Sequence, residues 1–467
     1  MNRPARNAPS RRLPPPERPR QIGLWLLVVT GLLLYAQARP AAGQTIGDAI
    51  TMEDLGLTMR LSPAARPAGM AGTYTSVGSD VHSILYNPAG LTGVFRPELT
   101  LGFQHQRRKL ELSYYDTPVD VDFSNSTLDH LSVAFPIPTY RGSFVLAAGV
   151  YRLYSNDLDL LYRGYNTATQ TQDHYRLQQS GSLYSFTLGA ATDLSPWVSL
   201  GGSVYLLNGN VSALTQYSFD FDTPIPGGTP ESVALIDDVT LDMTGVGGSV
   251  GFQIHPSRVV RVGLSVTTPT RLFVDGRGDQ EIAAYYPNSP DTFLVDSGNI
   301  AVDYTIPFRF NGGVAVFLPN VMLTGEVGYS DWAETRVDGK SIKDENLKPY
   351  FTEVISWSLA TEVTLPRVPV RLRAGYQYLP YALEYLNADR MAPLKRRYVI
   401  GLDPDDAFQQ AEVTQQRRVI AAGIGVLIGT SFTFDLSFEH SQGERRIPTM
   451  TDRRTSRRAA LTAAYRF

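Results

Sequence analysis

Hydrophobic and polar residues alternate along most of the chain from about residue 97 onward. Segment 431–439 reads SFTFDLSFE, segment 370–378 reads VRLRAGYQY, and segment 321–330 reads VMLTGEVGYS. A period of two places successive side chains on opposite faces of a β-strand. Each predicted strand therefore has one apolar and one polar face, which is typical of a sandwich or of a membrane barrel with a polar lumen.

The lengths of the connections favour the barrel. Six connections are very short and comprise residues 136–141, 193–196, 255–258, 318–320, 365–369 and 429–430. They alternate with a connection near 116–126 and with six long polar ones, 155–180, 209–238, 268–303, 332–350, 381–416 and 441–455. This asymmetry is typical of outer-membrane barrels, which have short turns on one side and long loops on the other. We therefore predict an all-β fold, a fourteen-stranded antiparallel transmembrane barrel over residues 97–467.

The N-terminus has the pattern of a signal peptide. Six arginines lie in residues 1–20, an uncharged apolar run follows at 22–36, and small residues at 41–43 resemble a cleavage site. The run suits a signal-peptide core and is short for a membrane-spanning helix. Cleavage after residue 43 would remove seven Arg and one Glu, so the net charge would change from −3 to −9.

The composition excludes several other classes. The 467 residues contain no cysteine, which rules out disulfides and thiolate chemistry, and the six histidines show no metal-ligand spacing. A net charge of −3 gives no footprint for nucleic acid. The segment Gly247–Gly251 fits G-x-S-x-G, but it lies in an alternating strand, where glycine eases curvature or makes room. We expect no enzyme, no metal and no cofactor.

Residues 44–96 lack strong alternation and carry a distinct motif. Segment 66–93 reads RPAGMAGTYTSVGSDVHSILYNPAGLTG. In it, Asn87 and Pro88 supply turn chemistry, while Ala89 and Gly90 permit close packing. Fourteen strands leave a lumen, so we expect this segment to form a plug within it.

Three elements of this segment resemble the FadL-like family of outer-membrane transporters for long-chain fatty acids and hydrophobic compounds. They are Gly69-Met70-Ala71-Gly72, Asp80, and Tyr86-Asn87-Pro88-Ala89-Gly90-Leu91. Ala71 stands where the family usually has Gly, and the match covers about 28 residues. The resemblance implies that residues 44–96 are a hatch, with gating assigned to Asn87, Pro88, Ala89 and Gly90. It also implies passive uptake of hydrophobic small molecules such as fatty acids or hydrocarbons.

Two of the long polar connections contain aromatic residues that could capture such a ligand. In connections 209–238 and 268–303 these candidates are Phe219, Phe221, Tyr285, Tyr286 and Phe293. Aromatic side chains in otherwise polar loops can line a binding groove. Strand packing is the rival explanation for them.

The last predicted strand points to the membrane and to its assembly machinery. Its alternating face ends in Tyr465-Arg466-Phe467, and outer-membrane barrels end in a similar amphipathic strand whose terminal Phe is read during assembly. The expected location is the outer membrane of a Gram-negative-type bacterium. Outer-membrane lipid, lipopolysaccharide and the barrel assembly machinery are then the expected partners.

The NPAGL motif at 87–91 also supports a second function. It is shared with PorV-like barrels, which bind protein partners in a bacterial secretion system. The alternative is therefore a partner-binding component of protein secretion. The identity of a small-molecule ligand does not follow from the sequence.

Overall fold

The computed structural model describes most of the chain beyond residue 61. The described residues are 62–114, 117–155, 157–166, 171–221, 231–286, 291–341, 353–380, 385–386, 411–412, 414–447 and 450–467. The predicted signal peptide, residues 1–43, and the first part of the predicted hatch, residues 44–61, lie outside them.

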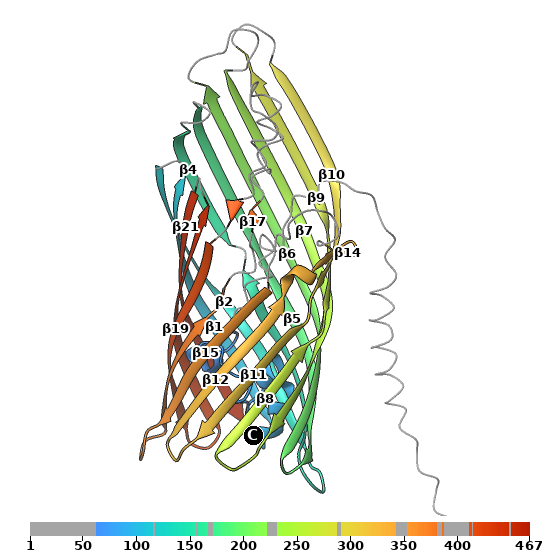
Figure 1. Cartoon of the computed structure of the whole chain (residues 1–467), viewed down its shortest axis with the longest axis vertical. Coiled ribbons are helices and arrows are strands. Elements are labelled where there is room, and N and C mark those ends of the chain that lie inside the picture. The colour runs from blue at the N-terminus through green and yellow to red at the C-terminus, as the bar shows by residue number, and fades with distance from the viewer. Residues whose placement is uncertain are drawn as a thin grey trace, which may run out of the picture. The chain divides into compact units, whose positions relative to one another are not determined.

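Fourteen strands form a closed antiparallel barrel, as predicted (Figure 1). Three of them are each made of two consecutive segments, β3 with β4, β8 with β9, and β10 with β11. β1 pairs with β21 from Glu98↔Arg466 to Tyr114↔Met450, which closes the sheet. The wall segments are β1 (Glu98–Tyr114), β2 (Thr117–Ile137), β3 (Phe144–Ser155), β4 (Leu158–Asn166), β5 (Thr171–Ser195), β6 (Val198–Phe221), β7 (Ser232–Ile254), β8 (Val260–Thr267), β9 (Thr270–Tyr285), β10 (Thr292–Ile306), β11 (Arg309–Phe317), β12 (Val321–Asp331), β15 (Glu353–Thr364), β16 (Val370–Tyr378), β19 (Thr414–Ile428), β20 (Phe432–Ile447) and β21 (Met450–Arg466).

Several short elements do not belong to the fourteen wall strands. Between β12 and β15 lie the 3₁₀ helix η3 (Trp332–Glu334) and the two-residue strands β13 (Arg336–Val337) and β14 (Lys340–Ser341). A separate two-stranded pair is formed by β17 (Tyr385–Leu386) and β18 (Ala411–Glu412). Among the described residues, no helix is long and apolar enough to cross a membrane.

Alternation along each strand separates an outer face from a luminal face. On β6, Val204 and Leu206 are exposed, whereas Leu207 and Val211 are buried. The outward side chains are large and apolar, so the exposed outer wall matches a lipid-facing belt. All six predicted short turns are confirmed, and they lie together at the lower end of the barrel in Figure 1.

The prediction of long polar loops at the other end was largely wrong. Strands β5, β6 and β7 have 25, 24 and 23 residues, far more than the roughly 9–11 that cross a bilayer. They and β9 and β10 extend through most of the connections predicted at 155–180, 209–238 and 268–303. On β6, for example, the exposed Gln216 and Asp220 alternate there with the buried Tyr217 and Phe219, so the period of two continues beyond the apolar belt.

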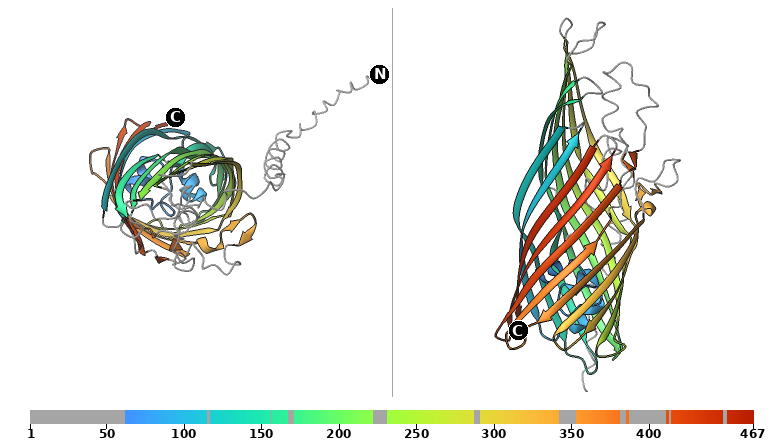
Figure 2. Two further views of the ribbon diagram at one scale, coloured as in Figure 1. Left: turned by 90° about the horizontal axis from the view of Figure 1, so that it is seen from above. Right: turned by 60° about the vertical axis from the view of Figure 1, so that its left-hand side comes forward.

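Residues 62–97, here called the luminal segment, lie inside the barrel near the short turns. They contain the short helices α2 (Ala65–Gly69) and α3 (Ser83–Tyr86) and the 3₁₀ helix η2 (Pro88–Gly93). The end-on view in Figure 2 shows these helices within the ring of strands. Contacts of η2 with β5, β6 and β7, and of α2 with β19, β20 and β21, hold opposite ends of the segment against opposite walls.

Candidate functional site

The conformation of the luminal segment follows from its small residues and its turn chemistry. Ala71 and Gly72, directly after α2, both have positive φ, at 50° and 76°, and reverse the chain there. Asn87 caps η2, because its side-chain oxygen accepts a hydrogen bond from the Ala89 amide at 3.1 Å. Pro88 occupies the first position of that helix, where its missing N–H costs nothing. The NPAGL motif is therefore a capped helical turn.

Glycines of the barrel wall make room for this segment. A Cβ atom at Gly201, Gly251, Gly263 or Gly375 would lie closer than 3.0 Å to an atom of the luminal segment. Each of the four lies on a different strand, β6, β7, β8 and β16, and faces the lumen. Side chains there would force the wall and the segment apart.

Gly251 shows how the wall and the motif fit together. A Cβ at Gly251 would collide with the Asn87 side chain, so the glycine of the G-x-S-x-G match makes room for that side chain. The Asn87 amide nitrogen then donates to the carbonyl of Phe252 on β7 at 3.0 Å and to that of Thr75 at 2.8 Å. Asn87 thus joins two parts of the luminal segment to the wall.

Charged side chains of the wall hold the extended part of the segment. The Glu326 carboxylate on β12 accepts hydrogen bonds from the amides of Tyr74 and Thr75 at 3.0 and 2.9 Å. Arg261 on β8 donates to the carbonyls of Val77 and Gly78, both at 2.9 Å. Backbone groups 74–78, which belong to no helix or strand, are satisfied by the barrel in this way.

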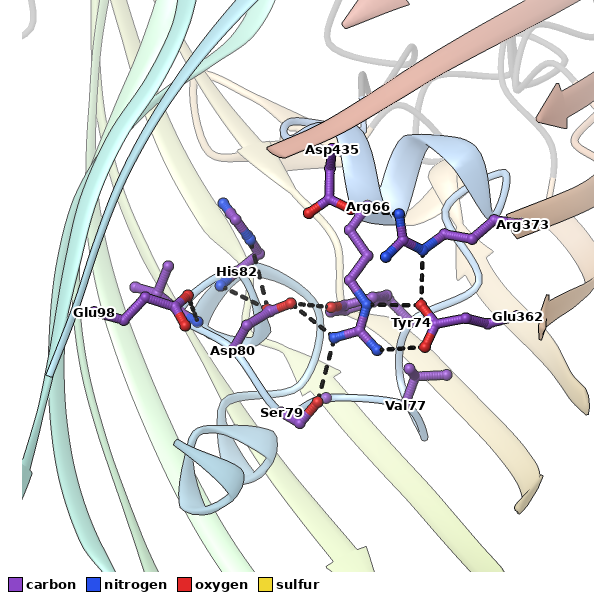
Figure 3. A network of polar contacts seen from close by, with 12 residues as sticks. Arg66, Tyr74, Val77, Ser79, Asp80, His82, Glu98, Glu362, Arg373 and Asp435 are labelled. Atoms are coloured by element: carbon purple, nitrogen blue, oxygen red, sulfur yellow. Dashed lines mark hydrogen bonds and ion pairs between the residues drawn. The ribbon is translucent and has the colours of Figure 1, made fainter. Parts of the chain in front are cut away.

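A buried ionic network connects the segment to β15, β16 and β20 (Figure 3). Arg66 of α2 binds both carboxylate oxygens of Glu362 at 3.1 and 3.2 Å and also contacts Asp80 at 3.0 Å. Arg373 contacts Glu362 at 2.7 Å and Asp435 at 2.5 Å. Three carboxylates and two guanidinium groups thus share this network, which is largely removed from solvent.

Two histidines extend the network toward β2. His82 Nε2 lies 3.1 Å from His130 Nε2, and His130 Nδ1 lies 3.1 Å from Asp129. Asp129 also accepts from the Ala64 amide at 2.7 Å. A β-bulge near Gly102 adds one residue to β2, so Asp129 and His130 are both buried in the lumen despite being adjacent.

The electrostatics of the segment favour a charged pair at Asp80 and His82. Burial alone would raise the pKa of Asp80, but the proximity and charge of His82, whose Nδ1 lies 3.5 Å from the carboxylate, followed by Arg66 and Tyr74, hold this pKa well below its usual range. Burial would lower the pKa of His82, and Asp80 outweighs this effect and raises it. The Tyr74 hydroxyl donates to Asp80 as well.

Above the luminal segment, the lumen wall becomes apolar. We call the following residues, from β3, β5, β6, β7, β9, β10, η3 and β15, the apolar cluster: Tyr154, Leu183, Leu207, Val211, Leu241, Met243, Leu272, Val274, Ile300, Val302, Tyr304, Ile306, Trp332 and Val354. On β6 the luminal residues change from Ser199 and Ser203 beside the segment to Leu207 and Val211 above it. On these strands, depth in the barrel therefore determines the chemistry of the luminal face.

The opposite wall carries arginines at the level above the segment. Arg108 of β1 lies diagonal to Arg454 of β21, which is in register with Leu110, and its guanidinium group lies 5.9 Å from the centroid of the Tyr154 ring. Arg417 is aligned with Gly443, and Gly443 with Arg454, along β19, β20 and β21. The Nη1 atom of Arg417 is buried and has no hydrogen-bond partner among the described residues. A guanidinium nitrogen in this position can donate a hydrogen bond to an anionic group.

The ladder between β2 and its neighbour is interrupted beside this wall. β2 pairs with β3 only from His130↔Tyr151 to Ile137↔Phe144, and in the described part of the chain the upper half of β2 has no ladder with β4. Side chains bridge the interruption instead. The Asp157 carboxylate accepts from Asn125 and from Ser155, each at 2.5 Å. Arg152 lies 3.4 Å from the same carboxylate.

The structure separates the residues that were grouped as ligand-capture candidates. Phe219 is buried in a second luminal cluster, against which Phe221 and Tyr286 pack. Tyr285 and Phe293 contact each other on the outer face and are 41% and 65% exposed. Phe219, Phe221, Tyr285 and Phe293 all lie in strands, so the prediction that they are loop residues was wrong.

The predicted hatch residues remain together, whereas the pairings of the ionic network were not predicted from the sequence. Asn87, Pro88, Ala89 and Gly90 are all buried inside the barrel. Arg66, Glu362 and Arg373 carry no shared motif, and the sequence contains no signal that pairs them. In the described part of the chain, no group of His, Asp and Glu side chains is arranged to hold a metal ion.

Comparison with solved structures establishes the type of fold. A FadL homologue of Pseudomonas aeruginosa is 13% identical with a TM-score of 0.57, covering 87% of this chain and 99% of that one. The toluene transporter TodX of Pseudomonas putida is 13% identical with a TM-score of 0.59, covering 88% and 100%. CymD, a monoaromatic hydrocarbon channel, is 15% identical with a TM-score of 0.54, covering 87% and 98%. The chain thus has a FadL-like barrel fold. Comparisons with protein-family models and with curated proteins find no match.

Proposed function

We propose that this protein is an outer-membrane channel for the passive uptake of hydrophobic small molecules. The observation that supports this most directly is the arrangement of the lumen along the barrel axis. The apolar cluster lies immediately above the luminal segment, which packs closely against glycines of the wall. An apolar lumen would accept a solute that the lipopolysaccharide leaflet excludes. The structural neighbours include a hydrocarbon channel and toluene transporters, which favours solute passage over a role in protein secretion and over catalysis.

In this proposal the luminal segment is the hatch. Asn87 would act as its hinge point, since one side chain joins η2, the Thr75 carbonyl and the β7 wall. Pro88 and Ala89 pack so closely against Gly201 that a ligand would find no space between η2 and β6 while the segment is seated. Passage then requires the segment to move, and the interrupted ladder between β2 and β4 offers a lateral exit.

We infer further that the favoured cargo carries a carboxylate. The apolar cluster suits an alkyl chain, and the wall that bears Arg108, Arg417 and Arg454 suits an anionic headgroup. A neutral hydrocarbon would use only the apolar wall. The capture residues of this proposal are Phe219, Phe221 and Tyr286, which meet at the luminal cluster farther from the segment, whereas Tyr285 and Phe293 face outward.

Uptake measurements in cells that depend on this protein test both the hydrophobic channel and its preference for a carboxylate. We expect faster uptake of a long-chain carboxylate than of its methyl ester, and we expect Arg417→Met with Arg454→Met to abolish that difference. Arg176→Gln, which removes an exposed arginine of β5, is the matched control. Equal rates for acid and ester in the unmodified protein would refute the carboxylate preference and leave the hydrophobic channel standing.

The hatch is tested separately with Asn87→Ala. Loss of its two carbonyl contacts and of the helix cap loosens the segment, so we expect an altered uptake rate in a barrel that assembles normally. Heat-modifiable migration on gels reports assembly. Unchanged uptake with normal assembly would exclude Asn87 from gating.

A further inference from the structure

The outer faces of β19, β20, β21 and β1 change abruptly from apolar to basic along the strands. On β1, Leu99, Leu101 and Phe103 are exposed, and the next outward residues are His105, Arg107 and Lys109. The same transition occurs on the three neighbouring strands. The outward apolar residues there are Leu461 on β21, Phe434, Leu436 and Phe438 on β20, and Ile420 and Ile424 on β19, and they precede Arg457 and Arg453, His440, and Arg418.

Sheet register brings the cations of this surface side by side. Arg457 is the direct partner of Arg107 on one side and of His440 on the other. Like charges directly opposite each other destabilise an antiparallel pair. Two guanidinium groups on adjacent strands therefore require an anion between them or an energetic compensation elsewhere.

Carboxylates of the protein compensate this charge only in part. Arg107 pairs with Asp122, Lys109 with Glu111 at 2.7 Å, and Arg453 with Glu444 at 3.3 Å. Arg457 is exposed and makes no hydrogen bond or ion pair with any described residue. Exposed ion pairs are worth little, so they would exchange readily for a stronger anion.

The far side of the barrel shows that this charge is local. On the outer face of β7 and β9, Asp238 is paired in register with Asp279, and Asp242 with Asp275. Arg277 is the cation among them. The chain has a formal charge of −3, so a basic surface on one side departs from the character of the whole protein.

We propose that these basic residues bind the phosphate groups of a membrane glycolipid whose acyl chains lie on the adjacent apolar belt. The binding site consists of Arg107, Arg457 and His440, which follow one another in register across β1, β21 and β20, and of Arg418 on β19, which is in register with Gln442, two residues beyond His440. A guanidinium fork matches phosphate geometry and stays charged at every physiological pH. The site occurs where an apolar wall gives way to charge, which is where a lipid headgroup meets water. The proposal is independent of the cargo in the lumen.

Lipid binding to the purified full-length protein tests this site. The protein is placed in phosphatidylcholine nanodiscs that contain either bisphosphorylated lipid A or its dephosphorylated form, and retained lipid is counted by native mass spectrometry. Arg107→Gln with Arg457→Gln removes charge-assisted hydrogen bonds to phosphate. We therefore expect retention of the phosphorylated form to weaken by about tenfold or more. Retention of the dephosphorylated form stays at background in both proteins.

Two controls accompany this measurement: a variant that removes the same number of charges elsewhere, and competition with inorganic phosphate. Arg277→Gln with Arg271→Gln removes two cations from β9 and leaves retention unchanged. Inorganic phosphate at millimolar concentration does not displace the glycolipid. Equal retention by the double variant, an equal loss in the control, or displacement by inorganic phosphate would each overturn the proposal. Heat-modifiable migration confirms that every variant has a folded barrel.

Discussion

The lower and upper parts of the lumen are lined by the same strands and yet differ completely in chemistry. Beside the luminal segment, β6 and β7 present Ser199, Gly201, Ser249 and Gly251. A few residues farther along, the same luminal faces present the leucines, valines and methionine of the apolar cluster. The lower lumen holds a piece of the protein itself, whereas the upper lumen presents the apolar side chains that would receive a molecule from outside in the proposed function.

This comparison explains why the lower lumen is rich in charge although it is buried. Buried ions are costly unless they are paired with good geometry. The network of Arg66, Glu362, Arg373, Asp435 and Asp80 pairs every ion with at least one opposite charge. Such a network selects one position for the segment, while the apolar cluster has no such directional preference.

The largest effect is expected from breaking the ionic network at Arg66. Arg66→Met leaves Asp80 without its guanidinium partner and Glu362 with Arg373 alone. Removing one member of a buried ion pair costs about 3–5 kcal/mol, so the segment should lose its seating while the barrel remains folded. Hydrogen exchange of residues 62–97 measures this loss. Restoration of part of the protection by adding Glu362→Gln would support the pairing, and unchanged protection in Arg66→Met would contradict it.

A second, somewhat smaller effect is expected from filling the space that wall glycines leave. Gly201→Val places a side chain where Pro88 and Ala89 lie, while Gly202→Val, one residue later, has no atom of the segment near it. Overpacking typically costs about 1–3 kcal/mol. We expect protease cleavage within 62–97 in the first variant and none in the second. Equal resistance of both variants to the protease would show that Gly201 does not determine how the luminal segment packs against the wall.

Much of the barrel could be predicted from the sequence, because its determinants are local. Alternation and the six short turns depend on neighbouring residues, and they sufficed for fourteen strands. The same reasoning failed above the belt, where the polar connection predicted at 209–238 includes residues 209–221, which belong to β6 and continue its alternation. Polarity indicates exposure to water, and an extended strand can be exposed to water too.

Only those parts of the candidate site whose residues are close together in the sequence could be predicted. The NPAGL motif determines the cap of η2 within five residues, so its turn character was visible. The pairing of Arg66 with Glu362 spans 296 positions and depends on how the barrel closes and how the segment enters it. Strict alternation would place Asp129 and His130 on opposite faces of β2, whereas the bulge near Gly102 brings both into the lumen.

A third effect, dependent on pH, is expected from His82. Its pKa is raised in the folded protein, so its charge stabilises the seated segment below the ordinary histidine pKa of about 6.5, and this stabilisation is lost as pH rises through the raised value. The pKa of Asp80 is lowered, so Asp80 stays ionised throughout neutral pH. Hydrogen exchange of 62–97, corrected for intrinsic rates, should show weaker protection at alkaline than at mildly acidic pH. In His82→Gln this difference should vanish, and its persistence would assign the pH dependence to another group.

The smallest effect on the luminal segment is expected from the upper lumen, and it separates the two levels most sharply. Leu207 belongs to the apolar cluster and lies on the same face of β6 as Gly201. Leu207→Ala together with Met243→Ala removes apolar surface above the segment and touches none of its anchoring contacts. Protection of 62–97 should therefore stay as in the unmodified protein. Binding of an apolar ligand should weaken, because each buried methylene contributes about 0.8 kcal/mol to burial.

Fluorescence titration with a long-chain probe measures binding of the ligand, and hydrogen exchange measures protection of the segment in the same samples. If the segment loosened along with the ligand, the two levels would be one cooperative unit, and the hatch would sense the cargo through the packing of the wall.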